Sequence, residues 1–252
     1  MSEGSDHIIE VRDLAVGYGG RTVLEGINFG VRRGEVFAIL GASGSGKSTL
    51  LKHLIGLYKP MRGDILISGR SLVEAEGDQR MRILRRFGVL YQGGALFGSL
   101  TTVENVRLPL DEFTDLSGPA KDLIALSKLR LVGLEEAATK LPADLSGGMQ
   151  KRAGIARAIV LDPCVLFLDE PSAGLDPMTS AGLDALIREL ARGLHITFVM
   201  VTHELPSIYS VADRVVVLDP KARRIVAEGT PAWLRDHAEQ LWVRQFMNRQ
   251  VA

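Results

Sequence analysis

The stretch from Gly41 to Thr49 constrains the fold of this chain more than any other feature. It reads GASGSGKST and fits the pattern G-x-x-x-x-G-K-[ST] of a phosphate-binding loop. An apolar run, Val36–Leu40, precedes the loop, and a helix-like run, Leu50–Leu57, follows it. This order predicts a strand, a tight loop and a helix, which is the opening unit of an α/β fold with a mostly parallel sheet.

The residue types in this loop suit a nucleotide phosphate. Glycines let backbone N–H groups approach phosphate oxygens closely, and the N-terminal end of the next helix adds positive potential. Lys47 would place its charge on the β and γ phosphates, and Ser48 would offer its hydroxyl to Mg²⁺. The alternative is a Gly/Ser-rich turn before a helix, without a ligand. The residues that we predict to bind the nucleotide here are Gly41, Ala42, Ser43, Gly44, Ser45, Gly46, Lys47, Ser48 and Thr49.

The composition is that of an ordinary globular protein. The 252 residues are 46% hydrophobic and 24% charged, which allows one substantial α/β core, or a core with a small lobe. Basic and acidic residues number 30 each and cancel, so nucleic acid is not expected as a principal partner. The single cysteine, Cys164, excludes a disulfide within the chain, and its apolar surroundings favour a buried thiol over a catalytic one.

The sequence shows no membrane segment. No apolar run reaches the roughly 18 residues that a spanning helix needs. The stretch Met1–His7 is polar and resembles neither a signal peptide nor an anchor. We therefore expect a soluble cytoplasmic protein that can still work at a membrane through a partner.

The N-terminal part predicts a small β subdomain. Ile8–Leu14 and Ile27–Val31 have the pattern of strands, and Asp64–Gly69 predicts a strand that returns to the same sheet. Tyr18 lies in a turn between the first two strands. It could simply cap a hairpin, or it could stack on an adenine ring, since an aromatic face with a polar edge suits a purine.

Helices dominate the middle of the chain. The segment Thr101–Leu141 has helical spacing, and we expect Pro109, Gly118-Pro119 and Pro142 to break it. A further helix should begin at Ser146, which suits the N-cap position, and should run to about Val160. We interpret residues of about 93–160 as a helical subdomain inserted into the α/β core.

The second half again alternates strands and helices. Val165–Leu168 and Ile196–Val201 predict buried strands, and Thr179–Arg192 predicts an amphipathic helix that Gly193 ends. A hairpin is expected around Asp219-Pro220. Residues 1–230 thus form one domain.

The remaining stretch, 231–252, predicts a helical extension. Leu234, Leu241, Trp242 and Phe246 recur there at helical spacing. This apolar face could pack on its own core or could contact a second subunit.

Four polar residues outside the loop follow predicted strands, and parallel strands bring their carboxyl ends to one edge. Asp169 is positioned to hold Mg²⁺, and Glu170 is suited to act as a general base toward water. Gln92 could orient that water and contact the metal, and His203 could bond to the γ phosphate. A buried structural acidic pair is the alternative, although two consecutive carboxylates after an apolar strand are costly without a cation. No pocket for a phosphoryl acceptor is apparent, so hydrolysis is favoured over kinase chemistry.

With these motifs, the segment Leu145–Met149, reading LSGGM, and the later Ser172–Asp176 complete an ordered set. Over residues 8–230 the chain resembles the nucleotide-binding subunit of an ABC transporter, an ATPase with a P-loop NTPase (RecA-like) core. The resemblance implies two copies that bind two ATP molecules between them. Ser146, Gly147 and Gly148 of one copy would contact the nucleotide held by the other, and Asp176 would lie at the seam.

Three shorter stretches narrow the resemblance. Met149 replaces the glutamine usual in the family, and Gln92–Phe97 and Val243–Phe246 are similar to the ATPases of Mla-type bacterial phospholipid transporters. Such an ATPase lies on the cytoplasmic side of the inner membrane. It works with an integral permease, an MCE-domain protein and, in some systems, a small STAS-domain subunit. The tail, through Trp242 and Phe246, would then bind across the dimer.

Other functions stay open at this level. A transporter ATPase for a sugar, amino acid or drug shares the same motifs. ABC ATPases of DNA repair or translation usually carry two cassettes or a long coiled-coil insertion, which this chain lacks. A small-molecule kinase leaves Ser146–Met149 unexplained, and a binding module without turnover requires that Glu170 be idle. Cargo and transport direction depend on subunits outside this sequence.

Overall fold

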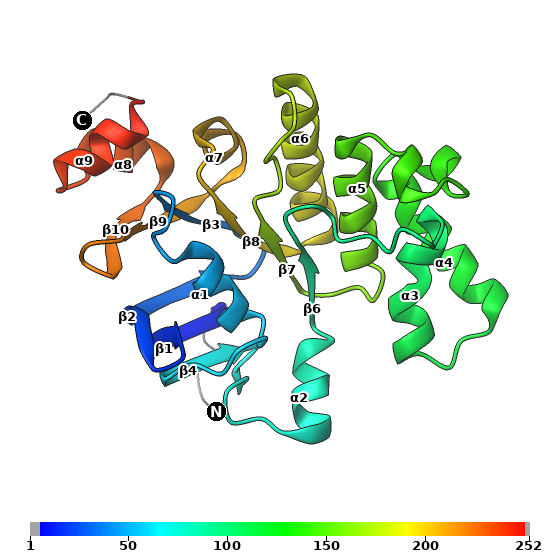
Figure 1. Ribbon diagram of the computed structural model, residues 1–252, viewed down its shortest axis with the longest axis horizontal. Helices are drawn as coiled ribbons and strands as arrows, with labels where there is room; N and C mark the ends of the chain where they lie inside the picture. The colour runs from blue at the N-terminus through cyan, green and yellow to red at the C-terminus, as the bar shows by residue number, and fades with distance from the viewer. Residues whose placement is uncertain (1–5, 250–252) are drawn as a thin grey trace.

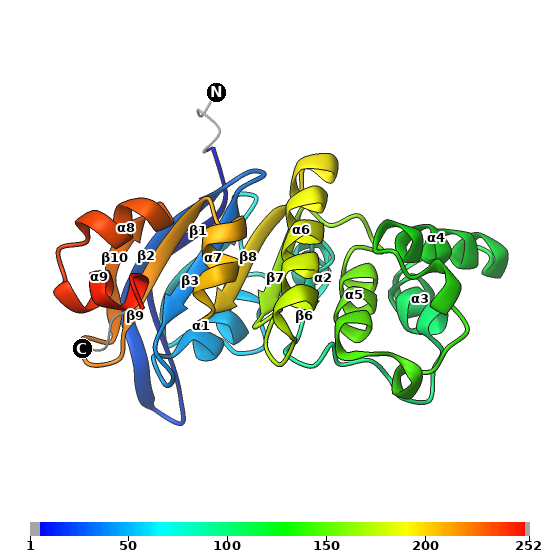
Figure 2. The ribbon, with the colours of Figure 1, turned by 90° about the horizontal axis from the view of Figure 1, so that it is seen from above.

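The computed structural model describes residues 6–249 as an α/β protein with two sheets (Figures 1 and 2). The larger sheet has six strands in the order β10-β9-β3-β8-β7-β6. Its strands in chain order are β3 (Val36–Gly41), β6 (Phe87–Leu90), β7 (Val165–Asp169), β8 (Thr197–Thr202), β9 (Arg214–Asp219) and β10 (Arg224–Gly229). All pairs in it are parallel except β9 with β10, which form the predicted hairpin. The predicted parallel core is confirmed.

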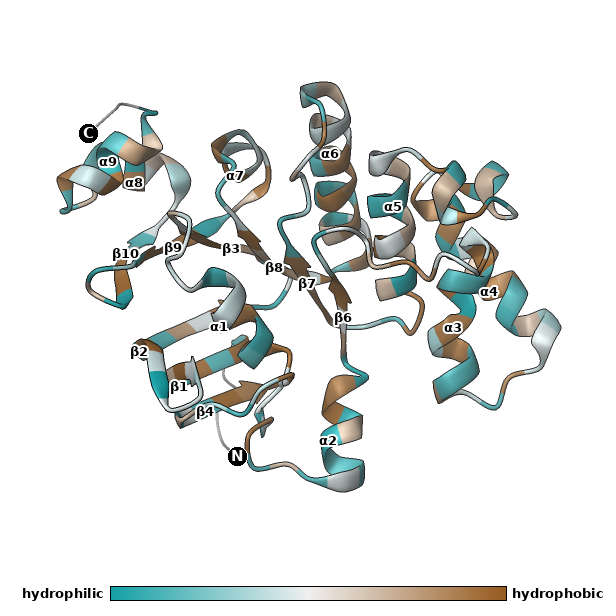
Figure 3. Ribbon diagram, viewed as in Figure 1, coloured by the Kyte–Doolittle hydropathy of each residue, from teal (hydrophilic) through white to brown (hydrophobic). Residues whose placement is uncertain are grey.

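The central strands are buried on both faces, which explains their continuous apolar sequences. Every residue of β3 and of β8 is buried, and Figure 3 shows these strands in brown. Side chains alternate between two cores. In β3, Ala38 and Leu40 face the core under α5 and α6, whereas Phe37 and Ile39 face the core shared with the N-terminal sheet.

The smaller sheet is the predicted N-terminal β subdomain. It is antiparallel, in the order β2-β1-β4-β5, and consists of β1 (His7–Tyr18), β2 (Arg21–Arg32), β4 (Arg62–Ile67) and β5 (Arg70–Ser71). Helix α1 (Lys47–Leu54) packs between the two sheets, because its buried Leu50, Leu51 and Leu54 belong to their shared core.

The helical lobe lies on the far side of β6 and holds α3 (Thr102–Phe113), α4 (Gly118–Leu131), two short 3₁₀ turns (Glu135–Ala137 and Pro142–Asp144) and the start of α5 (Gly147–Ala158) (Figure 1). Helix α2 (Gly77–Leu84) precedes β6. The limits of this lobe at about 93–160 stay a prediction.

The expected break at Pro109 is wrong, because Pro109 lies inside α3. A proline within a helix removes one N–H donor, and α3 continues for one more turn before it ends. Its start is well fixed, since Thr101 and Glu104 form a capping box.

Helix α6 (Pro177–Leu194) is followed by β8 and α7 (Leu205–Val211). It does not end at Gly193 as predicted. It continues through Leu194, and His195 takes the left-handed terminal position with φ 52°. The left-handed position that ends the helix thus falls on His195 and not on Gly193. Histidine is one of the residues other than glycine that adopt this conformation more often than most.

The tail forms two short helices, α8 (Pro231–His237) and α9 (Leu241–Met247), rather than one. Leu234, Val243 and Met247 are buried in the same core as the large sheet, and the Tyr209 hydroxyl donates to the carbonyl oxygen of Met247 at 3.0 Å. Trp242 and Phe246 are half-buried against this core. The tail therefore packs on its own subunit, and a contact across a dimer stays a prediction.

The structure bears on the expected lack of a membrane segment and on the thiol of Cys164. Within residues 6–249, no helix combines the length and the apolar character that crossing a membrane requires. Cys164 is half-buried and donates to the carbonyl oxygen of Arg86 at 3.2 Å. Most of the polar stretch Met1–His7 lies outside the described residues.

Candidate functional site

The phosphate-binding loop connects β3 to α1, as predicted. Gly44 and Gly46 adopt left-handed φ values of 77° and 92°, which only glycine reaches easily. Lys47 is buried, and its Nζ donates to the carbonyl oxygens of Gly41 and Ala42 at 2.8 and 3.1 Å. The ammonium group thus folds back over its own loop, where it would meet phosphate oxygens.

The two carboxylates lie beside this loop. Asp169 ends β7, and Glu170 follows it in a left-handed conformation with φ 47°. Burial lowers the pKa of Lys47, and the carboxylates of Glu170 and Asp169 act in the opposite direction. The lysine and both acids therefore interact electrostatically at one edge of the sheet. This agrees with the expectation that the carboxyl ends of parallel strands meet there.

Glu170 is held so that one carboxylate oxygen is committed and the other is not. Its Oε1 lies 2.9 Å from Nδ1 of His203, whereas its buried Oε2 has no hydrogen-bond partner among the described residues. His203 follows β8, and its side chain is 58% exposed. The sequence placed both residues at the same sheet edge, and the structure adds that they touch.

Asp169 and Ser48 fit the predicted magnesium role. The Asp169 Oδ1 is buried and lacks a partner within the described part of the chain, and Ser48 is exposed at the start of α1. Burial and the neighbouring Glu170 raise the pKa of Asp169, while Lys52, Lys151 and Lys47 oppose this shift. A cation would compensate such a carboxylate. In residues 6–249, no group of three or more His, Cys, Asp or Glu side chains is placed to hold a metal ion.

Gln92 lies just beyond β6, the neighbour of β7, and is exposed. The loop that carries it is tied to α5 by a residue that the sequence reasoning missed. Arg157 donates to the carbonyl oxygens of Gly94 and Ala95, each at 2.8 Å. Burial lowers the pKa of Arg157. A basic side chain on the apolar side of a helix was the only sequence signal for this contact.

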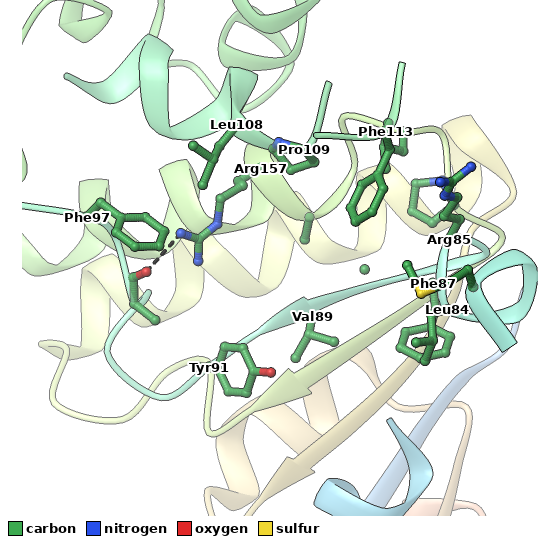
Figure 4. A pocket seen from close by; sticks show the side chains of 16 residues that line it. Leu84, Arg85, Phe87, Val89, Tyr91, Phe97, Leu108, Pro109, Phe113 and Arg157 are labelled. Carbon is green, nitrogen blue, oxygen red and sulfur yellow. Dashed lines mark hydrogen bonds between the residues drawn. The ribbon is translucent and has the colours of Figure 1, made fainter. Parts of the chain in front are cut away.

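A groove of about 520 Å³ opens beside the same loop (Figure 4). Strand β6 forms its floor, α2 and α3 contribute side walls, and Arg157 and Phe97 lie at one end. At the other end the Arg85 guanidinium stacks 4.9 Å from the centre of the Phe113 ring. Pro109, the proline inside α3, also lines the groove.

The LSGGM segment begins α5, away from the phosphate-binding loop. Ser146 is the N-cap, as predicted, and its Oγ accepts from the Met149 N–H at 3.3 Å. Gly147 lies against Leu175, since a Cβ on it would come within 3.4 Å of that side chain. Figures 1 and 2 show α5 on the lobe side of α6, with α1 on the opposite side.

Asp176 and Tyr18 have local partners. Asp176 caps α6, and its Oδ1 accepts from Met178 and Thr179 N–H groups at 3.0 and 3.1 Å. Tyr18 ends β1, which confirms its place in the hairpin. Its ring is 40% exposed and contacts Tyr58 edge-on with the centroids 5.0 Å apart. Stacking on adenine and a place at a subunit seam stay predictions for these two residues.

A model of the family described as "ABC transporter" matches residues 24–173. The chain belongs to this family. The fold agrees with ABC cassettes of known structure. A cassette from Clostridium perfringens, described as cbiO1 and part of the ABC transporter complex cbiONQ, has a TM-score of 0.84 at 32% identity, with 97% of this chain and 96% of that chain covered. The cassette MJ0796, in a dimeric post-hydrolysis state bound to ADP and Pi, has a TM-score of 0.79 at 30% identity and covers 88% of this chain and 98% of its own.

Relatives of similar sequence are ABC proteins as well. A probable ribonucleotide transport ATP-binding protein, mkl, of Mycobacterium leprae is 41% identical over 95% of this chain and 68% of its own length. MlaF, the intermembrane phospholipid transport ATP-binding protein, is 38% identical in Escherichia coli K12 over 98% of this chain and 91% of its own. The Haemophilus influenzae MlaF is 37% identical over 96% and 91%. This ABC subunit is thus an ATPase that binds and hydrolyses ATP.

Proposed function

We propose that this ABC ATPase works as a dimer that closes on two ATP molecules and drives phospholipid transport in a bacterial envelope. One observation carries the proposal. A single subunit collects Lys47, Asp169, Glu170 and His203 at one sheet edge, whereas the Ser146–Gly148 turn lies beyond α6. The turn and the catalytic edge would therefore complete each other only between two copies. The dimeric ADP-bound relative supports this arrangement.

The residues of one subunit have separate roles in this proposal. Lys47 would move from the Gly41 and Ala42 carbonyls to the phosphates when ATP enters. Glu170 Oε2, which has no hydrogen-bond partner within residues 6–249, would accept a proton from the attacking water. His203 would keep Oε1 in place while it bonds to the γ phosphate. Mg²⁺, held by Ser48, Asp169 and Gln92, would offset the negative charge of the phosphates.

The partner of the groove would be an integral membrane permease. The groove is mostly apolar and adjoins the Gln92 loop through Arg157, so it suits a short apolar helix on the cytoplasmic side of that permease. Movement of the loop on ATP binding or hydrolysis would then reach the membrane. An MCE-domain protein and a STAS-domain subunit would complete the assembly on the inner membrane.

The proposed cargo is inferred from the relatives of similar sequence. The alignments to MlaF span 91% of that protein, whereas those to mkl, at higher identity, span 68%. Near full-length agreement with MlaF, together with Met149 in place of glutamine, favours a phospholipid. Ribonucleotide transport is the second candidate because of the 41% identity to mkl.

Replacement of Glu170 by glutamine tests the mechanism. Glu170→Gln keeps the shape of the side chain but removes the base, so hydrolysis should fall about 10²- to 10⁴-fold while ATP still binds. A dimer should then accumulate with ATP, as measured by light scattering after size exclusion. The exposed Glu136→Gln serves as a matched control. A monomer with bound ATP would rule out closure of two copies.

Purification from native membranes tests the cargo and the partner. An integral permease with bound phospholipid, identified by mass spectrometry, is the expected result. Recovery of ribosomes or DNA instead of a permease would contradict a role in transport. Recovery of a permease without lipid would contradict phospholipid as the cargo and would leave the ATPase assignment unchanged.

A further inference from the structure

Lys151 is a buried charged residue on a helix face whose other buried side chains are apolar or small. It lies in α5 and is 5% exposed, next to buried Ala153, Gly154 and Ile155. Burial lowers the pKa of this ammonium group, and the carboxylates of Asp169, Glu170 and Glu204 oppose the shift. A buried lysine is costly unless it is paired and hydrogen-bonded, so its contacts call for a role.

The ammonium group contacts the main chain of the proposed base. Lys151 Nζ donates to the carbonyl oxygen of Glu170 at 3.1 Å, and the Ala173 N–H donates to the same oxygen at 3.2 Å. Glu170 needs such support, because a left-handed φ of 47° is strained for a residue that is not glycine. Residues persist in that region only where their surroundings hold them.

The hold on Glu170 is complete on three sides. Its N–H donates to the carbonyl oxygen of Val201 at 2.8 Å, its carbonyl oxygen accepts from Lys151, and its Oε1 contacts His203. Oε2 is left without a partner among the described residues. The direction of that oxygen thus depends on where these neighbours and Ala173 hold the residue.

One of these neighbours, Lys151, belongs to the helix that carries the LSGGM turn. Ser146 caps α5, and Lys151 follows five residues later, about 7–8 Å along the helix axis. The hydrogen-bonded backbone of α5 connects the two positions. A displacement of Ser146–Gly148 would therefore reach the Glu170 peptide through the Lys151 side chain, besides the contact of Gly147 with Leu175.

We infer that Lys151 is a positioning residue for hydrolysis: it ties the Glu170 backbone to α5, so that contact of the LSGGM turn with the partner's nucleotide aligns the base. The inference rests on the proposed dimer and on Glu170 as base. It gives α5 two outputs, one through Lys151 to Glu170 and one through Arg157 to the Gln92 loop.

Substitution of Lys151 by methionine tests the inference. Lys151→Met keeps the length of the side chain and removes the donor, so kcat should fall about 10- to 100-fold while KM for ATP and ATP binding stay within about twofold of wild type. Lys151→Arg, which keeps a donor and a charge, should recover most of kcat. Lys140→Met, at an exposed lysine, is the control. Hydrogen exchange of residues 169–176 should become faster in Lys151→Met.

The outcomes separate the inference from the proposed function. A wild-type kcat in Lys151→Met would overturn it. A joint loss of kcat, ATP binding and melting temperature, without recovery in Lys151→Arg, would reduce Lys151 to a structural residue. If Lys151→Met does not fold, Lys151→Gln decides the question through the same split between kcat and KM. Should Glu170→Gln hydrolyse ATP normally, the base itself would be wrong, whatever the lysine variants show.

Discussion

At the scale of single residues, His203 divides the two oxygens of Glu170 between two tasks. Oε1 is bound to the imidazole, and Oε2 lacks a partner in the described structure. A carboxylate with one oxygen fixed and one available can accept a proton in a defined direction. The largely exposed position of His203 leaves the other side of its ring accessible to a phosphate.

Removal of this imidazole should slow ATP hydrolysis but leave ATP binding intact. We expect His203→Ala to lower kcat about 100-fold, because it frees Glu170 and removes a bond to the γ phosphate. ATP binding should persist, since Lys47 and its loop are unchanged. Steady-state ATPase assays with nucleotide titration measure both quantities. His237→Ala, at an exposed histidine in α8, should be neutral, and equal losses in the two variants would contradict the role of His203.

At the scale of elements, Arg214 connects the two sheets through an ion pair and a main-chain hydrogen bond. Arg214 at the start of β9 donates to both carboxylate oxygens of Glu35, which precedes β3, at 2.7 and 2.9 Å. It also donates to the carbonyl oxygen of Gly30 in β2 at 2.5 Å. The side chains are only 16% and 7% exposed. Because the pair is bidentate and buried, loss of one partner leaves an uncompensated charge.

Arg214→Met should lower the free energy of unfolding by about 3 kcal/mol near neutral pH. Burial raises the pKa of Glu35, but the bonds from Arg214 and the Arg32 N–H outweigh this, so the pKa is lowered. Because the folded-state pKa of Glu35 lies below the unfolded-state value of about 4.3, the ionised carboxylate stabilises the folded protein at pH values above about 4.3. This stability is lost as the pH falls through the folded-state pKa. The difference from wild type should therefore shrink below about pH 4 in urea titrations.

The exposed pair of Arg130 and Glu135 is the matched control, since the Arg130 side chain is 73% exposed. Arg130→Met should leave the free energy of unfolding close to that of wild type, because an exposed ion pair contributes little. A cost for Arg214→Met that is equally small, or independent of pH, would show that the pair of Glu35 and Arg214 adds little stability.

At the scale of the whole molecule, the α/β core and the tail form one packed unit. The tail places Leu234, Val243 and Met247 in the core of the large sheet. Leu241 is the large exposed apolar residue of α9. Three apolar side chains of the tail are thus buried within the subunit, whereas Trp233 and Leu241 are exposed.

Truncation after Thr230 should therefore destabilise the subunit and spare the dimer. Loss of three buried side chains should cost on the order of 5 kcal/mol and lower the melting temperature in calorimetry. In the Glu170→Gln background, the truncated chain should still form the ATP-dependent dimer. Leu241→Ala, with its exposed side chain, should behave as the parent. An unchanged melting temperature together with loss of the dimer would instead assign the tail to the subunit seam.

Much of this molecule follows from local sequence. The loop Gly41–Thr49, the apolar strands and the caps at Ser146 and Asp176 are determined by residue types at short spacing. Such signals depend on backbone conformation and on periodic burial, which neighbouring residues specify. The convergence of Asp169, Glu170 and His203 also follows, because parallel strands align their ends.

Only the tertiary structure decided which groups meet across the chain. Lys151 and Arg157 bind main-chain carbonyl oxygens of Glu170 and of the Gln92 loop. A carbonyl oxygen is present in every residue, so no sequence pattern marks it as an acceptor. Pro109 within α3 and Gly193 within α6 likewise depart from the low helix propensity of these residue types. The sequence by itself determined the phosphate-binding loop, whereas the folded chain decided how α5 reaches the residues that would act on the nucleotide held there.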